Sequence, residues 1–214
     1  YGLPTRYSAV IRAIKEGYTF LQDVAAVEYE ESRYRQTRYM ANVAGVGFDA
    51  AVIKRGQMMN GNDKKKKGAG FYIRALINTF FRYKPTGVKI WVDDRLMYNN
   101  LLFSLAMGVG KYNGGGIQQL PQSVADDGLL DVTLIKPIHW WHVVFRLRRF
   151  FNGEIYSIGH VQHLQGSKIR IESSPEIDLE IDGELHGGTP VELRVLHRAV
   201  KVIVNKSFID KLKA

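Results

Sequence analysis

Hydrophobic and polar residues alternate strictly through the last third of the chain. The period of two begins at Ile169 and Ile171. It recurs in three later groups: Ile177/Leu179/Ile181, Val191/Leu193/Val195 and Val200/Val202/Val204. Such alternation is typical of antiparallel strands with one buried face and one face in contact with water. We therefore expect four half-buried strands in this part of the protein.

The first two thirds combine extended and helical patterns. Extended segments are expected at residues 20–30, 35–45, 88–92, 101–109 and 129–135. Helical spacing of apolar residues occurs at 5–16, 70–83 and 139–151, and Gly17 and Asn152-Gly153 end the first and third of these segments. The pattern predicts a mainly β fold, an antiparallel two-layer β-sandwich with two or three helices.

The composition is that of a globular protein with enough apolar residues for a core. Of 214 residues, 45% are hydrophobic and 24% are charged. The absence of cysteine excludes a disulfide framework, a thiolate metal site and a thiol nucleophile, and is compatible with a cytosolic protein. No apolar run reaches the roughly 18–20 residues of a spanning helix, and the first residues do not resemble a signal peptide. Because the chain opens without Met, we expect it to be a piece of a longer protein.

The net charge of +9 favours anionic partners. Much of the excess lies between residues 54 and 84, where nine Lys and Arg residues accompany one Asp. The sequence has no helix-turn-helix, zinc-finger or aromatic RNA-binding signature, so nucleic acid is not expected. A phosphorylated ligand or an acidic lipid surface fits the charge better.

Two glycine-rich motifs could bring the backbone close to a ligand. The first contains Asn42, Gly45 and Gly47, at the end of an expected strand. The second is Asn113-Gly114-Gly115-Gly116, where three glycines carry an entropic cost that a simple hairpin does not require. Close approach of the backbone to a phosphate is one interpretation of both. A plain turn for the first and a flexible loop for the second are the alternatives.

Two acidic motifs could carry chemistry. In the first, Asp127 lies between Val124 and Leu129, and its carboxylate together with backbone carbonyls could hold a hard cation. In the second, Asp182-Gly183-Glu184 ends an alternating segment, and Glu184 could act as a general base for a hydroxyl group. An Asp-Gly turn beside a strand is the ordinary meaning of both motifs, and spacing alone does not decide.

Two further segments suggest a surface for lipid. The predicted helix at 139–151 carries a wide apolar arc with two tryptophans and several arginines, which suits the boundary of an acidic bilayer or, alternatively, burial in the core. The basic run upstream is either a solvated loop or a source of membrane attraction. The candidates for membrane contact are Lys64, Lys65, Lys66, Lys67, Trp140, Trp141, Arg146 and Arg149.

Taken in order, these motifs resemble the bacterial diacylglycerol/sphingosine kinase-like family of lipid kinases. The resemblance extends over nearly the whole chain. It rests on Gly2-Leu3-Pro4, Asn42 with Gly45, Gly47 and Asp49, the glycine triplet 114–116, Asp126-Asp127-Gly128-Leu129-Leu130-Asp131 and Asp182-Gly183-Glu184.

The resemblance implies that the chain is the C-terminal domain of a two-domain lipid kinase. Residues 1–17 would form a helix that adjoins an N-terminal nucleotide-binding domain, and residues 18–214 a β-rich lipid-substrate domain. ATP would be bound mainly by the N-terminal domain, whose Gly-Gly-Asp-Gly loop is absent from this sequence. The chain alone is therefore expected to be inactive.

The resemblance also assigns roles to individual residues. Glu184 would be the general base, supported by Asp182. Mg²⁺ would be held by the Asp127 carboxylate and by the backbone carbonyls of Val124 and Leu129. We expect this cation to clamp its loop, because a single carboxylate backed by carbonyls suits a structural role.

The expected partners follow from these assignments. They are a lipid alcohol such as diacylglycerol or a sphingoid base, an anionic membrane surface, the protein's own nucleotide domain and, as a further option, a second copy of the chain. The expected location is cytoplasmic with peripheral membrane association. Two alternatives stay open: a related kinase with a soluble acceptor such as NAD, and a non-catalytic module that binds anionic membranes.

Overall fold

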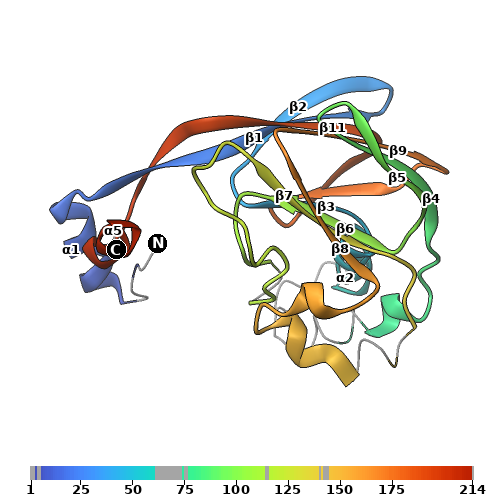
Figure 1. Ribbon diagram of the computed structural model, residues 1–214, viewed down its shortest axis with the longest axis horizontal. Coiled ribbons are helices and arrows are strands. Elements are labelled where there is room, and N and C mark those ends of the chain that lie inside the picture. Colours follow the sequence, from blue (N-terminus) through green and yellow to red (C-terminus); the bar gives the residue numbers. More distant parts are fainter. Residues whose placement is uncertain are drawn as a thin grey trace.

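A computed structural model describes residues 3, 6–60, 74, 77–113, 116–139, 141 and 145–213. Within these ranges, a mostly antiparallel sheet curls into two layers, and a two-stranded arm leads away from it towards two helices (Figure 1). The strand order along the curled sheet is β5-β4-β9-β11-β10-β3-β6-β7-β8, with β1 paired to β11 and β2 paired to β1. The mainly β, sandwich-like fold predicted from the alternation is confirmed.

Some elements are joined by short turns and others by long connections, such as residues 109–129. The helices are α1 (Tyr7–Glu16), α2 (Phe48–Asn60) and α5 (Lys206–Lys213), with 3₁₀ turns η1 (Leu147–Phe150) and η2 (Ile155–Ser157). The strands are β1 (Thr19–Glu31), β2 (Tyr34–Met40), β3 (Val43–Gly47), β4 (Thr86–Val92), β5 (Arg95–Leu102), β6 (Ser104–Gly108), β7 (Leu130–Ile135), β8 (Val161–Gly166), β9 (Lys168–Ser174), β10 (Asp178–Ile181) and β11 (Glu184–Ile203).

Strand β11 joins the two layers. Along one edge it pairs with β1 from Gly188 to Ile203. Along its other edge it pairs first with β10, at residues 184–188, and then with β9, at residues 191–194. Because β9 and β10 use different parts of the same edge, the sheet divides there into a β5-β4-β9 layer and a β10-β3-β6-β7-β8 layer.

The main hydrophobic core lies between these layers. The apolar members of the alternating segments point into it and are almost completely buried, among them Ile90, Leu105, Val132, Ile169, Ile171, Leu179 and Leu193. The period-two prediction is therefore correct for which face is buried. It is less successful for the opposite face of β10, which was expected to be in water and is covered by α2 and adjacent loops.

Several strand boundaries differ from the predicted ones. Residues 35–45 form two strands, because the backbone leaves β2 after Met40 and re-enters the sheet at Val43. The apolar run 101–109 is interrupted at Phe103, so it contains the end of β5 and all of β6. The two groups of valines between 191 and 204 belong to one long strand, β11, which contains a bulge near Arg198. Strand β8 and most of β5 were not predicted.

The helices show where periodicity is informative. Helix α1 ends at a left-handed Gly17, as predicted. Helices α2 and α5 were not predicted, since α2 has no clear apolar stripe and α5 is only eight residues long. Of the predicted helix at 70–83, the described residues Arg74 and 77–80 are helical. The described part of 139–151 is helical at 141 and 145–146 and ends in the 3₁₀ turn η1.

The outer ends of β1 and β11 form the arm. Thr19 pairs with Ile203 and Phe20 with Val202, and beyond them the strands lead to α1 and α5 (Figure 1). The Phe20 and Phe208 rings meet edge to face at 5.3 Å between centroids, which links α5 to the arm. Helices α1 and α5 therefore lie at the far end of the arm, away from the curled sheet (Figure 1).

Candidate functional site

A tight hairpin turn presents the predicted acidic motif. β10 and β11 are joined by Asp182 and Gly183, whose φ angles of 48° and 88° are those of a two-residue turn with both central residues left-handed. The Asp182 carboxylate accepts hydrogen bonds from the backbone N–H groups of Ala41 (2.7 Å), Asn42 (2.9 Å) and Val43 (3.1 Å). These bonds fasten the turn to the segment between β2 and β3, and they leave Glu184 exposed beside it.

A second glutamate lies directly beneath this turn. Glu180 is only 1% exposed, and its Oε2 accepts a 3.0 Å hydrogen bond from the Gly183 N–H. Its Oε1 is buried and makes no hydrogen bond within the described part of the chain. Burial, reinforced by the nearby acids Asp49 and Asp182, raises the pKa of Glu180 to about 8, against the opposing effect of the Gly183 N–H and the Asn113 amide.

The glycine at position 45 makes this arrangement possible. Gly45 pairs with Glu180 across β3 and β10. A Cβ atom at Gly45 would lie 2.9 Å from Oε1 of Glu180, closer than real Cβ atoms approach, and 3.1 Å from Cβ of Asp49, which is a tight contact. The missing side chain therefore provides the space in which the two acids approach each other. This is a packing role for the first glycine motif.

Asp49 connects the buried acids to the second glycine-rich motif. It lies in the first turn of α2, and its Oδ2 accepts a 2.7 Å hydrogen bond from the Gln119 amide. Burial raises the pKa of Asp49 to about 6, and hydrogen bonds from Gln119 and Ser104 oppose the shift. Gln119 in turn accepts a 3.2 Å hydrogen bond from Asn113. The acids and the Asn113 loop thus form one polar network.

Asn42 links the same loop to the turn. Its side-chain amide donates to the Tyr112 carbonyl at 3.1 Å, while its backbone N–H donates to Asp182. The predicted residues Asn42, Gly45, Asn113 and Asp182 are therefore brought together. Gly116 lies in open space with a φ of 114°, and Gly114 and Gly115 lie outside the described residues. Gly47 is the last residue of β3, directly before α2.

The Asp126-Asp127-Gly128 loop is hydrogen-bonded to a buried aspartate. Asp23 is fully buried in β1 and accepts hydrogen bonds from the backbone N–H groups of Gly128 (2.7 Å) and Arg198 (2.6 Å). The His197 ring nitrogen Nδ1 lies 3.0 Å from the same carboxylate. Asp23 therefore fastens the loop to the bulge of β11 at the base of the arm.

Asp127 itself is surrounded by acids. Its Oδ1 accepts a 3.0 Å hydrogen bond from the Leu129 N–H, and Oδ2 lies 3.4 Å from the Gln165 amide. Burial, helped by Asp131 and Asp23, raises the pKa of Asp127. Within the described residues, no group of three or more His, Asp or Glu side chains is placed to hold a metal ion. A cation at this loop would therefore depend on Asp127 and on backbone carbonyls, such as those of Val124 and Leu129.

Both acidic motifs lie where the strands end on the same side of the sheet. Ala44 pairs with Ile181 and with Met107, and Val132 pairs with Met107, so one row crosses β10, β3, β6 and β7. The turn after β10 and the loop before β7 both lie just beyond this row, on the same side of it. Three strand spacings separate them, or about 14 Å. The Asp127 loop is thus a neighbour of the turn and not part of the network around Glu180.

A histidine–aspartate pair, in which the aspartate is buried and the histidine is partly exposed, occupies the outer face of β7 and β8. His163 Nε2 lies 2.7 Å from Oδ1 of the fully buried Asp131. The Tyr156 ring packs against the His163 ring at 4.8 Å, and its hydroxyl is 3.1 Å from that of Thr133. Thr133 also donates to the Gln119 carbonyl at 2.7 Å. The pair therefore braces the segment that carries Gln119.

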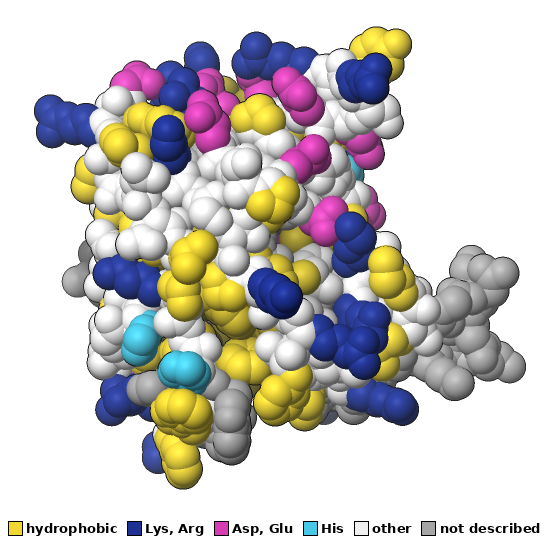
Figure 2. Space-filling model, turned by 90° about the vertical axis from the view of Figure 1, so that its right-hand side faces the viewer, with side chains coloured by type: hydrophobic (Ala, Val, Ile, Leu, Met, Phe, Trp, Pro, Cys, Tyr) yellow, Lys and Arg dark blue, Asp and Glu magenta, His cyan; other side chains and the backbone are white. Residues whose placement is uncertain are grey.

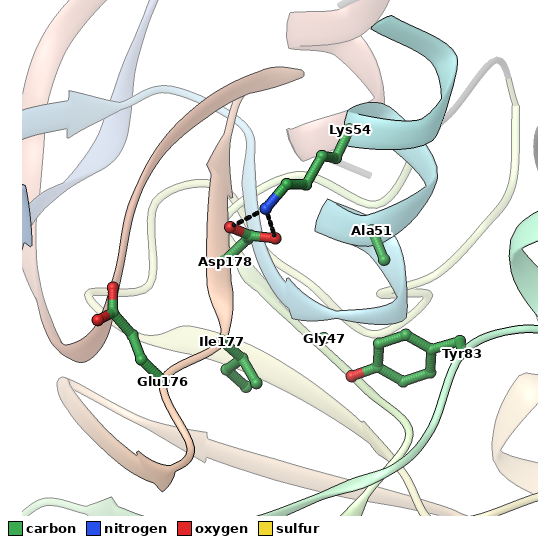
Figure 3. Close-up of a pocket in the computed structure, with 7 residues that line it drawn as sticks. All are labelled: Gly47, Ala51, Lys54, Tyr83, Glu176, Ile177 and Asp178. Carbon is green, nitrogen blue, oxygen red and sulfur yellow. Dashed lines mark hydrogen bonds and ion pairs between the residues drawn. The ribbon is translucent and has the colours of Figure 1, made fainter. Parts of the chain in front are cut away.

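A small cavity lies further along α2, on the side of β10 away from the turn. Its volume is about 350 Å³, and its lining residues are Gly47, Ala51, Lys54, Tyr83, Glu176, Ile177 and Asp178 (Figure 3). Lys54 on α2 donates to both carboxylate oxygens of Asp178, at 2.9 and 2.8 Å. Burial, with Asp49 and Asp178 nearby, raises the pKa of Tyr83 to about 12. The cavity is small and polar, and is not by itself a chamber for acyl chains.

Exposed apolar side chains gather at one end of the molecule. Seen from the side in Figure 2, hydrophobic and basic side chains predominate in the lower half and acidic ones in the upper part. The described segments at that end expose Phe81 (69%), Phe145 (85%), Phe151 (52%) and Trp141 (42%). Among the described residues, no helix is long and apolar enough to cross a bilayer.

The predicted membrane residues are only partly described. Trp141 is exposed and its ring stacks on His139 with centroids 4.4 Å apart. Arg146 and Arg149 are half-buried, and Arg149 donates to the Ser157 carbonyl. Lys64, Lys65, Lys66, Lys67 and Trp140 lie outside the described residues. Their contact with a membrane stays a prediction.

The sequence interpretation missed the acids that organise the site. The alternation of Ile177, Leu179 and Ile181 puts Glu180 on the polar face of its strand, but nothing local indicates that α2 covers that face. Asp23 carries one usable signal, since it is a charged residue inside an otherwise apolar strand. Asp49 lay in the glycine motif but was assigned no role of its own.

Comparison with known proteins places this geometry in a family. Residues 42–204 match the model of the YegS C-terminal NAD kinase beta sandwich-like domain. A diacylglycerol kinase of Bacillus subtilis (strain 168) is 25% identical over 130 residues, which are 60% of this chain and 42% of that protein. The chain thus spans less than half the length of this relative.

The fold is shared with a solved structure. The crystal structure of a diacylglycerol kinase from Bacillus anthracis str. Sterne matches with a TM-score of 0.63 and 18% sequence identity. The match covers 96% of this chain and 61% of that one.

Proposed function

The chain belongs to the family of YegS C-terminal NAD kinase beta sandwich-like domains, and we propose that it is the substrate-binding and catalytic-base half of an ATP-dependent lipid kinase. The acceptor would be the hydroxyl group of a lipid alcohol such as diacylglycerol or a sphingoid base. The observation that carries the proposal is the Asp182-Gly183-Glu184 turn, which is fastened by three backbone hydrogen bonds and leaves Glu184 accessible.

Glu184 would serve as the general base. An alcohol is a poor nucleophile, so removal of its proton by a carboxylate within hydrogen-bond reach favours its attack on phosphorus. The Glu184 carboxylate accepts that proton while the acceptor oxygen bonds to the γ-phosphorus and the bond to the leaving ADP breaks. Asp182 would support the base by fixing the turn, because its carboxylate is already saturated with backbone donors.

We expect the phosphoryl donor to bind mainly outside this chain. In this family's pattern the nucleotide domain precedes the present residue 1, and α1 and α5 would contact that domain from the end of the arm. The base of the arm would act as the hinge between the two domains. The isolated chain is therefore expected to bind its lipid but to transfer no phosphate.

The residues at the Asp127 loop fit a divalent cation. Asp131 and Asp23 lie near Asp127, and burial, helped by these two acids, raises the pKa of Asp127. Mg²⁺ bound by the Asp127 carboxylate and by the carbonyls of Val124 and Leu129 would neutralise the charge of these acids. Because Asp23 joins the loop to the β11 bulge, the cation would stiffen the base of the arm.

A lipid acceptor also requires access from a membrane. The exposed aromatic residues Trp141, Phe145 and Phe151 lie with Arg146 and Arg149 at one end of the molecule. Aromatic rings with nearby basic groups suit the interface of an anionic bilayer. We propose that this end rests on the membrane while the acceptor enters the domain.

The test is phosphate transfer from labelled ATP by the full-length protein that contains this chain. The acceptor panel comprises diacylglycerol, a sphingoid base, other lipid alcohols in mixed micelles, and NAD. Glu184→Gln is compared with wild type and with Glu172→Gln, a control in β9 whose side chain is 47% exposed. We expect one lipid to be labelled, and Glu184→Gln to reduce the rate about 10²–10⁴-fold, the usual contribution of a general base.

Other outcomes would redirect the assignment. Labelling of NAD alone would identify a soluble acceptor. Binding to anionic vesicles without labelling of any acceptor would indicate a non-catalytic membrane module. A folded Glu184→Gln variant as active as Glu172→Gln would show that Glu184 is only a turn residue.

A further inference from the structure

Glu180 is a buried acid that the proposed chemistry does not use. It is 1% exposed and lies on β10, two residues before the Asp182-Gly183 turn. One carboxylate oxygen holds the Gly183 N–H, and the other makes no hydrogen bond within the described residues. An unpartnered, ionised carboxylate oxygen is costly to bury, whereas a protonated one loses most of that cost.

The surroundings of Glu180 do not supply a compensating cation. Asp49 faces it from α2 and Asp182 from the turn, and both raise its pKa. β3 contributes Gly45 and β11 contributes Leu185 opposite Glu180. On the same strand, the carboxylate of Asp178 is already paired with Lys54. Besides these two acids and two uncharged neighbours, the Asn113 amide acts on the carboxyl group and opposes the rise of its pKa, but it carries no charge.

We propose that Glu180 is a positioning residue that works in its protonated form. One of its carboxyl oxygens accepts the hydrogen bond from the Gly183 N–H, and the other, on the side of Asp49, carries the proton. This inference rests on the proposed role of Glu184 as the base. Glu184 follows Gly183 directly, so a bond to the Gly183 N–H controls where the base lies. A neutral Glu180 also adds no negative charge beside Glu184, which must stay ionised to accept a proton.

The Asp182 carboxylate and the Glu180 carboxyl group hold the turn from two sides. The Asp182 carboxylate accepts hydrogen bonds from the segment between β2 and β3, and the Glu180 carboxyl group accepts one from the Gly183 N–H in the turn. Loss of the proton would place an unpartnered negative charge between Asp49 and Asp182. The turn would then relax away from Glu180, and the base would move with it. The activity should therefore fall as the pH rises through about 8.

The first experiment follows the protonation state directly and needs no activity. Glutamate side chains of the 214-residue chain are labelled with ¹³C at the carboxyl carbon, and Glu180 is assigned by the signal that disappears in Glu180→Gln. We expect this signal to titrate near pH 8, well above the ordinary glutamate value of 4.5. Titration near 4.5 would overturn the proposal.

The second experiment measures the pH profile of phosphate transfer by the full-length protein. Wild type and the Glu172→Gln control should lose activity with rising pH around 8. Glu180→Gln keeps an acceptor for Gly183 and a permanent N–H donor, so it should remain active and lack this alkaline loss. Glu180→Leu removes both functions and should lower kcat/KM about a hundredfold, the effect of displacing a catalytic group by about 1 Å.

The outcomes separate this inference from the proposed function. If no acceptor is phosphorylated while Glu180 still titrates near pH 8, the kinase assignment fails and the protonation state of Glu180 stands. If phosphate is transferred and Glu180→Gln keeps the same alkaline loss as wild type, the kinase assignment stands and the role of Glu180 is refuted. If Glu180→Leu unfolds, the comparison of Glu180→Gln with Glu172→Gln still decides.

Discussion

The buried carboxyl group of Glu180 should make the stability of the protein fall with rising pH. The perturbation is Glu180→Gln, which replaces a titrating group by a neutral one of nearly the same shape. In the unfolded chain Glu180 ionises at its ordinary pKa of 4.5, while in the fold its pKa is about 8. Between these values the folded state retains a proton that the unfolded state has released.

The sign and size follow from proton linkage. The free energy of unfolding changes with pH in proportion to the protons bound by the unfolded state minus those bound by the folded state, so here it decreases. Each unit of pKa difference corresponds to about 1.36 kcal/mol. The shift from 4.5 to about 8 therefore lowers stability by about 5 kcal/mol across this window, and no further loss follows above it.

The assay is urea-induced unfolding of wild type, Glu180→Gln and Glu172→Gln at a series of pH values across the window. Apart from Glu180 and Glu172, the three proteins have the same titrating groups, so the informative quantity is the difference in unfolding free energy. We expect Glu180→Gln to gain about 5 kcal/mol relative to wild type between pH 4.5 and 8. Asp49 loses a like-charged neighbour in this variant, so its own pKa should fall.

Parallel profiles for wild type and Glu180→Gln would refute the reasoning, because Glu180 would then titrate alike in the folded and unfolded states. A gain of the same size in Glu172→Gln would also refute it. That carboxylate is 47% exposed and should make little difference.

Three further predictions address the turn, the cation and the core. Asp182→Ala removes the acceptor for three backbone N–H groups and should lower the free energy of unfolding in urea by about 2–3 kcal/mol. Asp182→Asn keeps one acceptor oxygen and should lose less. Equal losses in the two variants would argue against the charged hydrogen bonds. Mg²⁺ should raise the melting temperature of wild type, and Asp127→Asn should abolish the rise; an equal rise in both would exclude Asp127 as a ligand. Leu105→Ala should destabilise the chain by about 2–5 kcal/mol in the same urea assay, since Leu105 is fully buried between the layers; a loss below 1 kcal/mol would contradict this packing.

Local pattern was a good guide to the elements of the curled sheet. The alternation at 177–181 correctly identified Ile177, Leu179 and Ile181 as core residues, because the side-chain period of a strand depends only on its own backbone. Gly17 and the Asp182-Gly183 turn were equally readable, since left-handed backbone favours those residues. The order of the motifs was also enough to indicate the kinase family.

The partners of each strand were not readable in this way. The long strand β11 was predicted as two shorter ones, because its bulge near Arg198 interrupts the pattern although the strand continues along β1. Helix α2 was missed because its apolar residues form no clear stripe. It packs against β6 and β10, which are distant in sequence, as well as against β3, which it follows directly.

What the sequence alone determined is therefore the class of fold, the buried face of the alternating strands and the turn that carries Glu184. Tertiary structure decided the chemical state of the site. Glu180 and Asp49 are 131 positions apart, and they meet only because β3 and β10 pair at Gly45 while α2 folds over them. The pKa of a carboxyl group depends on the water it loses and on the charges it gains, and both are properties of the assembled fold.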